Sequence, residues 1–360
     1  MIENTILRRT LLIVGVVVVA GIITAIERSG NKSSVPPDAP NLPPSEQGLP
    51  GAPDFSGATG WINTPNATGL DLVGLRGKVV LVDVWTYSCI NCIHTLPHVT
   101  ALYDTYRDHG LVVVGVHSPE FGFEKVRANV ADAVVRYGIH YPVAQDNDFG
   151  IWNAYHNHYW PADYLVDQYG KIRDTHAGEG GYADQEKKVR DLLNEAGYTD
   201  LPAPLEGGVE TGLGPHTSEL YAAAGRSAVA NPEGYRQDQD VGYAVPAEIG
   251  RDAIYLGGRW HDGPDAVTAL ANGTVFVDFA GSGANMVADG PAGACVEVLL
   301  DGQPVPAAMT PSDVTTRAGK SCILLDRARS YDLYRGPNER HALELRVPEG
   351  FQLFTFDFTG

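Results

Sequence analysis

Two of the chain's four cysteines, Cys89 and Cys92, stand three residues apart. A nearly continuous apolar run with one acid, Lys78–Trp85, precedes them and is typical of a strand buried on both faces. Helical spacing follows over 90–108. Cys89 would then lie at a helix N-terminus, where free N–H groups and the helix dipole favour the thiolate that attacks disulfides. Cys92, one turn further on, would lie close enough to release a mixed disulfide.

Two other kinds of site use the same residues. Cys89 and Cys92 could form half of a zinc site with His94 or His98, or a purely structural bridge. A second C-x-x-C motif is absent and the histidines do not repeat a zinc-finger spacing, so a redox pair is favoured. The HNH stretch at 156–158 could coordinate a metal, although such histidines more often lie at the surface. We predict neither a metal nor a cofactor.

Apolar runs and amphipathic runs alternate around the pair. The expected elements are a strand at Leu111–Val116, a helix at Glu124–Tyr137, strands at Ala162–Val166 and Lys171–Thr175, and a helix at Glu186–Ala196. Strand–helix alternation followed by a hairpin predicts an α/β sandwich over a mixed sheet.

Several stretches in this order resemble one family. They are "WTYSCINC", "GVHSPEF", "YWPADYLVDQYGKI" and "GEGGY". The chain resembles the thioredoxin superfamily, within it the TlpA/ResA-like branch, and in particular the extracytoplasmic part of the DipZ-type proteins. The resemblance covers about Leu75 to Tyr198 closely and the C-terminal part more loosely. It implies a thioredoxin fold and exchange of disulfides with protein thiols.

The resemblance assigns roles to individual residues. Cys89 and Cys92 match the redox pair, with Cys89 as the nucleophile. Pro161 matches the cis-proline that faces the pair in this fold, and a cis X–Pro bond is a rare, position-specific feature. Trp160 before it would offer backbone groups on which a substrate strand can lie.

Three further matches lie near the pair. Asp83 corresponds to the buried acid that relays protons to the second cysteine. Glu120 falls where ResA-like proteins keep an acid near the active site, although a solvated loop acid is an equal alternative. Trp85 corresponds to the tryptophan packed beneath the pair.

The N-terminal segment indicates where in the cell the protein is expected to act. Leu11–Ile26 runs for 16 residues without a charge and follows Arg8 and Arg9. Signal-peptide cores span about 7–15 residues and membrane-spanning helices about 17–25, so both an uncleaved anchor and a cleaved signal fit residues 1–28. The arginines keep the N-terminus cytoplasmic and place the rest outside. We expect a single-pass membrane protein with extracytoplasmic domains or, if the signal is cleaved, a secreted one.

Composition changes along the exported part set the domain boundaries. A Pro/Ser/Gly-rich linker is expected at 29–53, a thioredoxin-like domain at 54–198, a second linker at 199–215, and a β domain at 216–360. Short alternating runs in this last part predict an all-β sandwich, most simply a jelly roll. Cys295 and Cys322 lie there, and we expect one structural disulfide between neighbouring strands, because disulfides persist outside the cytoplasm.

Aromatic residues of the β domain raise the question of a ligand. Tyr255, Trp260, Tyr331 and Tyr334 could stack on sugars, and core packing is the alternative for each of them. A cell-wall glycan is therefore a possible partner, and a plain scaffold that presents the first domain is the other reading. The net charge of −18 argues against nucleic acid, whose binding requires an excess of Lys and Arg.

The predicted function is extracytoplasmic thiol–disulfide exchange. Ile90 and Asn91 supply no cation between the cysteines, which favours a reducing potential and action as a reductase. DipZ-type proteins carry a multi-span electron-delivering part, so the resemblance implies that a separate membrane protein of the CcdA/DsbD type supplies electrons here. Two alternatives stay open: a surface binding protein with a secondary redox domain, and a thiol peroxidase. Thr86 suits the peroxidase pattern, but Val82 stands where that pattern has proline.

Overall fold

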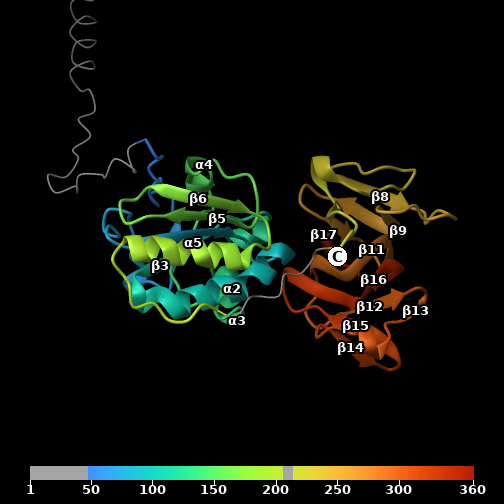
Figure 1. Cartoon of the computed structure of the whole chain (residues 1–360). Helices are drawn as coiled ribbons and strands as arrows, with labels where there is room; N and C mark the ends of the chain where they lie inside the picture. The colour runs from blue at the N-terminus through green and yellow to red at the C-terminus, as the bar shows by residue number, and fades with distance from the viewer. Residues whose placement is uncertain (1–47, 206–213) are drawn as a thin grey trace, which may run out of the picture. The chain divides into compact units, whose positions relative to one another are not determined.

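The computed structural model describes residues 48–205 and 214–360, which fall within one compact unit, Gly48–Gly360 (Figure 1). The expected anchor at 1–28 and most of the linker at 29–53 lie outside the described residues. Within the described ranges, none of the helices has the length and apolar character needed to cross a bilayer. We call 48–205 the first domain and 214–360 the β domain.

The first domain is built on a six-stranded mixed sheet of order β1-β4-β3-β2-β5-β6. Its strands are β1 (Gly60–Ile62), β2 (Val79–Trp85), β3 (Leu111–His117), β4 (Val143–Gln145), β5 (Ala162–Val166) and β6 (Ile172–Ala177). β2, β3 and β4 are parallel, whereas β5 and β6 run antiparallel to their neighbours. This is the thioredoxin fold that the sequence predicts, and every residue of its central strand β2 is buried.

Helices cover both faces of this sheet. The helices are α2 (Ile90–Tyr106), α3 (Arg127–Arg136), α4 (Gly150–Ala154) and α5 (Tyr182–Glu195), with short 3-10 turns η2 (Pro65–Ala67), η3 (Arg107–His109) and η4 (Gly122–Lys125). Apolar residues of α2, α3 and α5 pack with alternate β2 residues, Val79 and Leu81, in one core. The intervening residues Val80 and Val82 pack with α4 and the N-terminal segment in another. Alternation along β2 therefore builds two layers.

The structure corrects one predicted helix. The segment expected to be helical over Glu124–Tyr137 divides at Val126, whose φ of −74° and ψ of 113° are extended. The break has a local cause, because the Glu124 carboxylate accepts hydrogen bonds from the backbone N–H groups of Glu120 and Phe121. That arrangement holds a 3-10 turn before α3 begins. The last helix, α5, begins at Tyr182, four residues before the predicted start at Glu186.

The β domain is antiparallel throughout its named strands. They are β7 (Leu220–Tyr221), β8 (Gln239–Tyr243), β9 (Ile254–Asp262), β10 (Val267–Ala269), β11 (Gly273–Asp289), β12 (Cys295–Leu300), β13 (Gln303–Pro304), β14 (Val314–Arg317), β15 (Lys320–Leu324), β16 (Arg329–Val347) and β17 (Gln352–Thr359), with turns η5 (Ala224–Arg226) and η6 (Ala307–Met309). β11 pairs with β9 through its first half and with β17 through its second. Register shifts near Gly281 and Ala284 accompany the change of partner. One hydrophobic core joins strands from both ends of the sheet.

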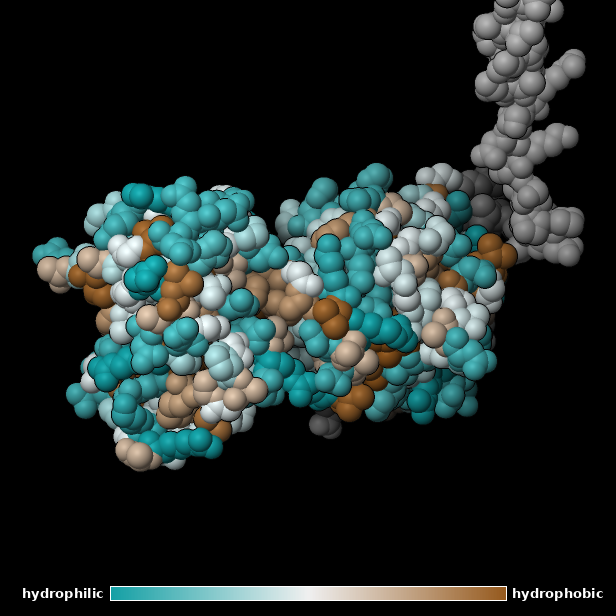
Figure 2. Space-filling view, turned by 180° about the vertical axis from the view of Figure 1, so that it is seen from behind, coloured by the Kyte–Doolittle hydropathy of each residue, from teal (hydrophilic) through white to brown (hydrophobic). Residues whose placement is uncertain are grey.

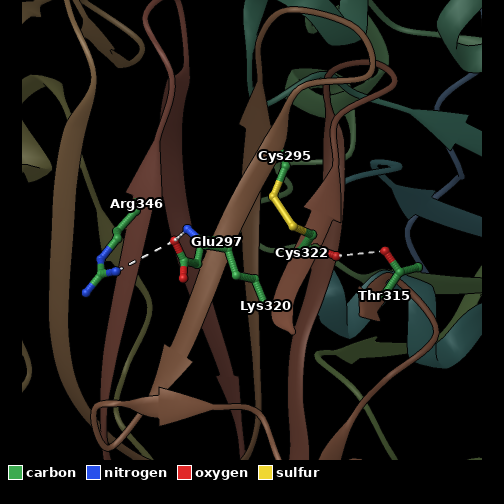
Figure 3. The surroundings of a disulfide bond; sticks show 6 residues. All are labelled: Cys295, Glu297, Thr315, Lys320, Cys322 and Arg346. Carbon is green, nitrogen blue, oxygen red and sulfur yellow. Dashed lines mark hydrogen bonds and ion pairs between the residues drawn. A yellow bond between two sulfur atoms is a disulfide. The ribbon is translucent and has the colours of Figure 1, made fainter. Parts of the chain in front are cut away.

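Cys295 and Cys322 form the predicted disulfide between the neighbouring strands β12 and β15 (Figure 3). The two cysteines are separated by 27 positions. In the chain-entropy model a loop of this size stabilises the folded state by about 3.6 kcal/mol. Figure 3 also shows Glu297 of β12 next to Arg346 of β16, and its carboxylate pairs with Lys320 as well.

The aromatic residues considered for sugar stacking lie largely in the core. Trp260, Tyr331 and Tyr334 are fully buried, so their rings are unavailable to a ligand. Tyr255 alone of the four is partly exposed. On the face shown in Figure 2, hydrophilic residues predominate and hydrophobic residues form small separate groups, as the high net charge leads one to expect.

Candidate functional site

Cys89 and Cys92 carry free thiols at the start of α2. Cys89 is the N-cap residue, and its sulfur accepts a hydrogen bond from the backbone N–H of Cys92 at 3.4 Å. Cys89 is partly exposed whereas Cys92 is fully buried. Burial raises the pKa of the Cys92 thiol, and its contact with Cys89 and the charge of Asp83 raise it further. The outer thiol is thus placed to meet a substrate and the inner one to resolve the product.

Asp83 lies behind the pair, fully buried in β2. It faces a second acid, Asp163, directly across the antiparallel β2–β5 pairing. The Tyr141 hydroxyl donates to Asp83 Oδ2 at 3.3 Å, and the Gln185 amide donates to Asp163 Oδ2 at 2.6 Å. The other oxygen of each carboxyl has no hydrogen-bond partner among the described residues. Two acids so placed have too few donors to be ionised together.

Titration of this acid pair follows from its position. Burial raises the pKa of Asp83 well above its ordinary value, and the charge of Asp163 adds to the effect. Burial likewise raises the pKa of Asp163 to about 7. The pair therefore holds a proton near neutral pH, close to the thiol of Cys92. Sequence reasoning found Asp83 but not Asp163 or Tyr141, since only strand register and packing bring them together.

Trp85 and His117 form the floor beneath the redox pair. Trp85 is fully buried and packs in the same core as Cys92, as predicted from the resemblance. The His117 ring lies edge-on to Trp85 at 5.1 Å and stacks on Tyr87 at 5.6 Å. Burial lowers the pKa of His117 to about 3, so this ring is neutral at physiological pH. The floor is consequently apolar and uncharged.

The carboxylate of Glu124 fixes the approach to Cys89. It is fully buried and accepts from the Ser88 hydroxyl at 2.6 Å and the Glu120 N–H at 2.6 Å. It also accepts from the backbone N–H groups of Ser88 and Phe121. One side chain thus ties the residue before the nucleophile to the loop after β3. The sequence does not indicate this role of Glu124, because Ser88 lies far from it along the chain.

Glu120 and Trp160 line the same cavity as Cys89. The indole N–H of Trp160 donates to the Ser118 carbonyl at 3.0 Å, which holds its ring beside the loop that carries Glu120. The Trp160–Pro161 peptide bond is cis, and Pro161 is buried at the start of β5. The structure thus places Glu120 and Trp160 at Cys89, and Asp83 and Trp85 behind Cys92.

The β domain also reaches this cavity. The Tyr221 hydroxyl lies 2.6 Å from Glu120 Oε1, and the Arg226 guanidinium lies 3.1 Å from the same oxygen. Phe354 of β17 packs on the Phe121 and Phe123 rings of the first domain at 5.2 and 4.8 Å. Tyr221 and Arg226, which hold Glu120, follow it by about a hundred residues in the chain. Local sequence patterns therefore could not indicate these contacts.

The histidines weighed as zinc ligands have other contacts. His94 Nδ1 lies 3.1 Å from Glu179 Oε2, and the His98 ring packs on Tyr182 at 4.6 Å. In the described ranges, no three His, Cys, Asp or Glu side chains converge in a way that could hold a metal ion.

The Asp83–Asp163 pair predicts a pH dependence of stability. An unfolded aspartate has a pKa of about 3.9, so the folded protein binds more protons than the unfolded chain between about pH 4 and 7. The free energy of unfolding should therefore fall as pH rises through this window, by up to about 1.4 kcal/mol per pH unit for one proton. Asp163→Asn should make this decline shallower in urea unfolding followed from pH 4 to 8.

The surface variant Asp191→Asn serves as the control, because Asp191 is an exposed partner of Lys187. It should keep the wild-type slope. If Asp163→Asn keeps that slope too, the pair does not hold the proton.

Two family models match the chain. The AhpC/TSA family matches residues 51–175 and the thioredoxin like C-terminal domain matches residues 217–359. The first match spans the redox pair and the cis peptide bond, and the second spans nearly all of the β domain.

Curated relatives agree with the geometry. Protein DipZ of Mycobacterium tuberculosis is 37% identical over 323 residues, which cover 85% of this chain and 42% of that protein. The chain thus spans less than half the length of this relative. Thiol-disulfide oxidoreductase YkuV of Bacillus subtilis is 32% identical over 143 residues, which cover 40% of this chain and 94% of that protein. With its C-x-x-C pair at a helix start on this sheet, the chain belongs to the thioredoxin-like thiol–disulfide oxidoreductases.

Proposed function

We propose that the protein exchanges disulfides with protein substrates through Cys89 and Cys92. The observation that carries the proposal is the asymmetry of the pair: a partly exposed thiol at a helix N-terminus and a fully buried thiol one turn further on. The Cys89 thiolate attacks a substrate disulfide and forms a mixed disulfide, and one substrate sulfur leaves as a thiolate. The Cys92 thiolate then attacks Cys89, which releases the second substrate thiol and leaves Cys89–Cys92 oxidised. Two electrons pass from the protein to the substrate.

Asp83 is proposed to take the proton of Cys92 in the second step. Its charge is among the causes that raise the pKa of the Cys92 thiol, which supports a close approach of the two groups. A raised carboxyl pKa suits this task, because proton transfer is most effective when the acid and base are matched near the working pH.

We propose that the protein acts outside the cytoplasm, anchored or secreted through residues 1–28, and works as a reductase that receives electrons from a separate membrane protein of the CcdA/DsbD type. The Cys295–Cys322 disulfide supports an oxidising compartment. The similarity to thiol-disulfide oxidoreductase YkuV supports exchange, and the absence of a cation at Ile90 and Asn91 supports the reducing direction.

Exchange is favoured over the peroxidase alternative. In the peroxidase pattern the threonine hydroxyl would serve the reactive cysteine. Here the Thr86 hydroxyl lies 3.4 Å from His117 Nε2, on the apolar floor of the site. The buried second cysteine behind the first is, in contrast, what disulfide exchange requires.

Binding of a cell-wall glycan by the β domain stays a second candidate. It is supported by a hollow of about 680 Å³ lined by polar and charged groups that include Asn272, Glu297, Lys320 and Arg346. Sugar hydroxyls could hydrogen-bond to these groups, although the hollow holds none of the buried aromatic residues that suggested stacking.

Cys92→Ser should trap mixed disulfides, because the covalent intermediate on Cys89 could no longer be resolved. The reduced variant is incubated with proteins that contain disulfides. Non-reducing electrophoresis and mass spectrometry should then reveal mixed disulfides at Cys89. Cys89→Ser/Cys92→Ser should give none. If Cys92→Ser captures no substrate while its Cys89 thiol remains titratable, disulfide exchange is not the activity.

Asp83→Asn should slow release of the substrate from the mixed disulfide by on the order of 10²-fold, the usual contribution of general acid–base catalysis. Attack by Cys89 should be little changed, because Asp83 lies behind Cys92. Rapid-quench measurement of both steps separates them, with Asp191→Asn as the control. Equal rates of resolution in both variants would exclude the relay.

The glycan candidate is tested on the full chain with an array of cell-wall glycans. Binding that Lys320→Ala/Arg346→Ala abolishes would support the hollow as the site. Binding of no glycan by the folded wild type would leave the β domain without this function.

A further inference from the structure

A cavity of about 130 Å³ adjoins Cys89 and is lined by both domains. The β domain contributes two carboxyl groups to it. Beside Cys89 and Glu120 of the first domain, the lining includes Glu219, Tyr221 and Asp357. A carboxyl group at the mouth of a reactive thiol can donate or accept a proton during chemistry, so the state of these acids matters to the reaction.

Asp357 is the more deeply placed of the two acids. It lies on β17 with 7% of its surface exposed, and its Oδ2 accepts no hydrogen bond from an N–H or O–H group of the described residues. The carboxyl of Glu219 lines the same cavity, and its charge adds to burial in raising the pKa of Asp357. Two neighbouring carboxylates repel each other where water is largely excluded, so a proton held by one of them is favoured.

The hydroxyl of Tyr221 gives independent evidence that one carboxyl group in this cavity carries a proton. Its hydroxyl oxygen lies 2.6 Å from Glu120 Oε1 and 2.7 Å from Glu219 Oε2. The hydroxyl has one proton and can donate it fully to only one carboxylate. The other short contact is satisfied when that carboxyl carries a proton and donates to the tyrosine oxygen.

Charge decides which acid keeps its proton. Arg226 pairs with Glu120 at 3.1 Å and lies over the Tyr221 ring at 3.5 Å, so Glu120 is the ionised member that accepts from Tyr221. Among the described residues neither Asp357 nor Glu219 forms an ion pair, although the charge of Arg226 lowers the pKa of Glu219 in part. Burial raises the pKa of both, together with the charge of Glu219 on Asp357 and that of Glu120 on Glu219. The charge of Cys89 also raises the pKa of Asp357, which places the thiol within electrostatic reach.

We propose that Glu219 and Asp357 form a proton-sharing pair, supplied by the β domain, that protonates the substrate sulfur displaced when Cys89 attacks a disulfide. The inference rests on the exchange function proposed above. Asp83 would then serve Cys92 from one side of the site, and the β-domain pair would serve the Cys89 step from the other.

The Cys89 thiolate forms a bond to one sulfur of the substrate disulfide, and the sulfur–sulfur bond breaks with its electron pair on the leaving sulfur. The pair donates its one proton to that thiolate, which departs as a thiol, and the pair is left fully ionised. In the reverse direction the ionised pair takes the proton from an incoming substrate thiol. No further oxidant or reductant is needed.

The test compares two disulfides that differ in the basicity of the leaving sulfur. Bis(2-hydroxyethyl) disulfide releases a basic alkyl thiolate that benefits from protonation, whereas 5,5′-dithiobis(2-nitrobenzoate) releases an aromatic thiolate that is stable unprotonated at neutral pH. Stopped-flow rates of Cys89 attack should fall at least about tenfold with the alkyl disulfide in Glu219→Gln and in Asp357→Asn. The rates with the aromatic disulfide should not fall.

Simple loss of negative charge would not slow either reaction, and it would ease approach of the anionic aromatic disulfide to Cys89. The double variant should be no slower than about the slower single variant, because the pair acts as a unit. Asp240→Asn, which removes a β-domain carboxyl outside the cavity, should behave as wild type. If Asp357→Asn does not fold, as judged by near-UV circular dichroism, Glu219→Gln alone carries the test, because Glu219 is the less buried residue of the pair even though its carboxyl group faces the cavity.

Equal loss of rate with both disulfides would indicate a structural role and overturn the proposal, as would unchanged rates with both. Failure of the exchange function itself looks different. In that case wild type would react no faster than Cys89→Ser with either disulfide.

Discussion

The redox site depends on a strand that is buried on both faces and still carries an acid. Every residue of β2 is buried, and its alternating side chains build the two cores of the first domain. Asp83 in the middle of that strand cannot be solvated, so its charge must be shared or neutralised. Asp163 lies opposite Asp83 and Tyr141 donates a hydrogen bond to it, and the two acids together hold a proton near neutral pH. The position of β2 also sets where α2 begins, and with it the exposure of Cys89.

The site combines three acidic groups in different states. Glu124 is buried but accepts several hydrogen bonds and acts as a fixed anchor. Asp83 has one donor and a like-charged neighbour, and burial raises its pKa. Glu120 is balanced by Arg226. The same functional group is therefore anchored in Glu124, suited to the proposed proton transfer in Asp83 and charge-paired in Glu120, and the donors and charges around each carboxyl make the difference.

What could be predicted from the sequence depends on how far apart the interacting residues lie. The spacing of Cys89 and Cys92 behind an apolar run was sufficient to predict β2, the start of α2 and the asymmetric thiol pair. The disulfide between Cys295 and Cys322 and the cis bond before Pro161 are confirmed as well. The break at Val126 was missed, because helical periodicity continues through it while a side-chain anchor overrides the local preference. Glu219 and Asp357 could not be found, since only tertiary contacts bring them to Cys89.

The Glu124 anchor has a mechanical consequence. One carboxylate holds both Ser88, the residue next to the nucleophile, and the backbone of Glu120, the residue that binds Tyr221 and Arg226 of the β domain. If the loop that contacts the β domain is displaced, either the hydrogen bonds of Glu124 break or the start of α2 moves with the loop. The Glu124 carboxylate is thus a direct structural link between the loop that meets the β domain and the residue next to the reactive sulfur.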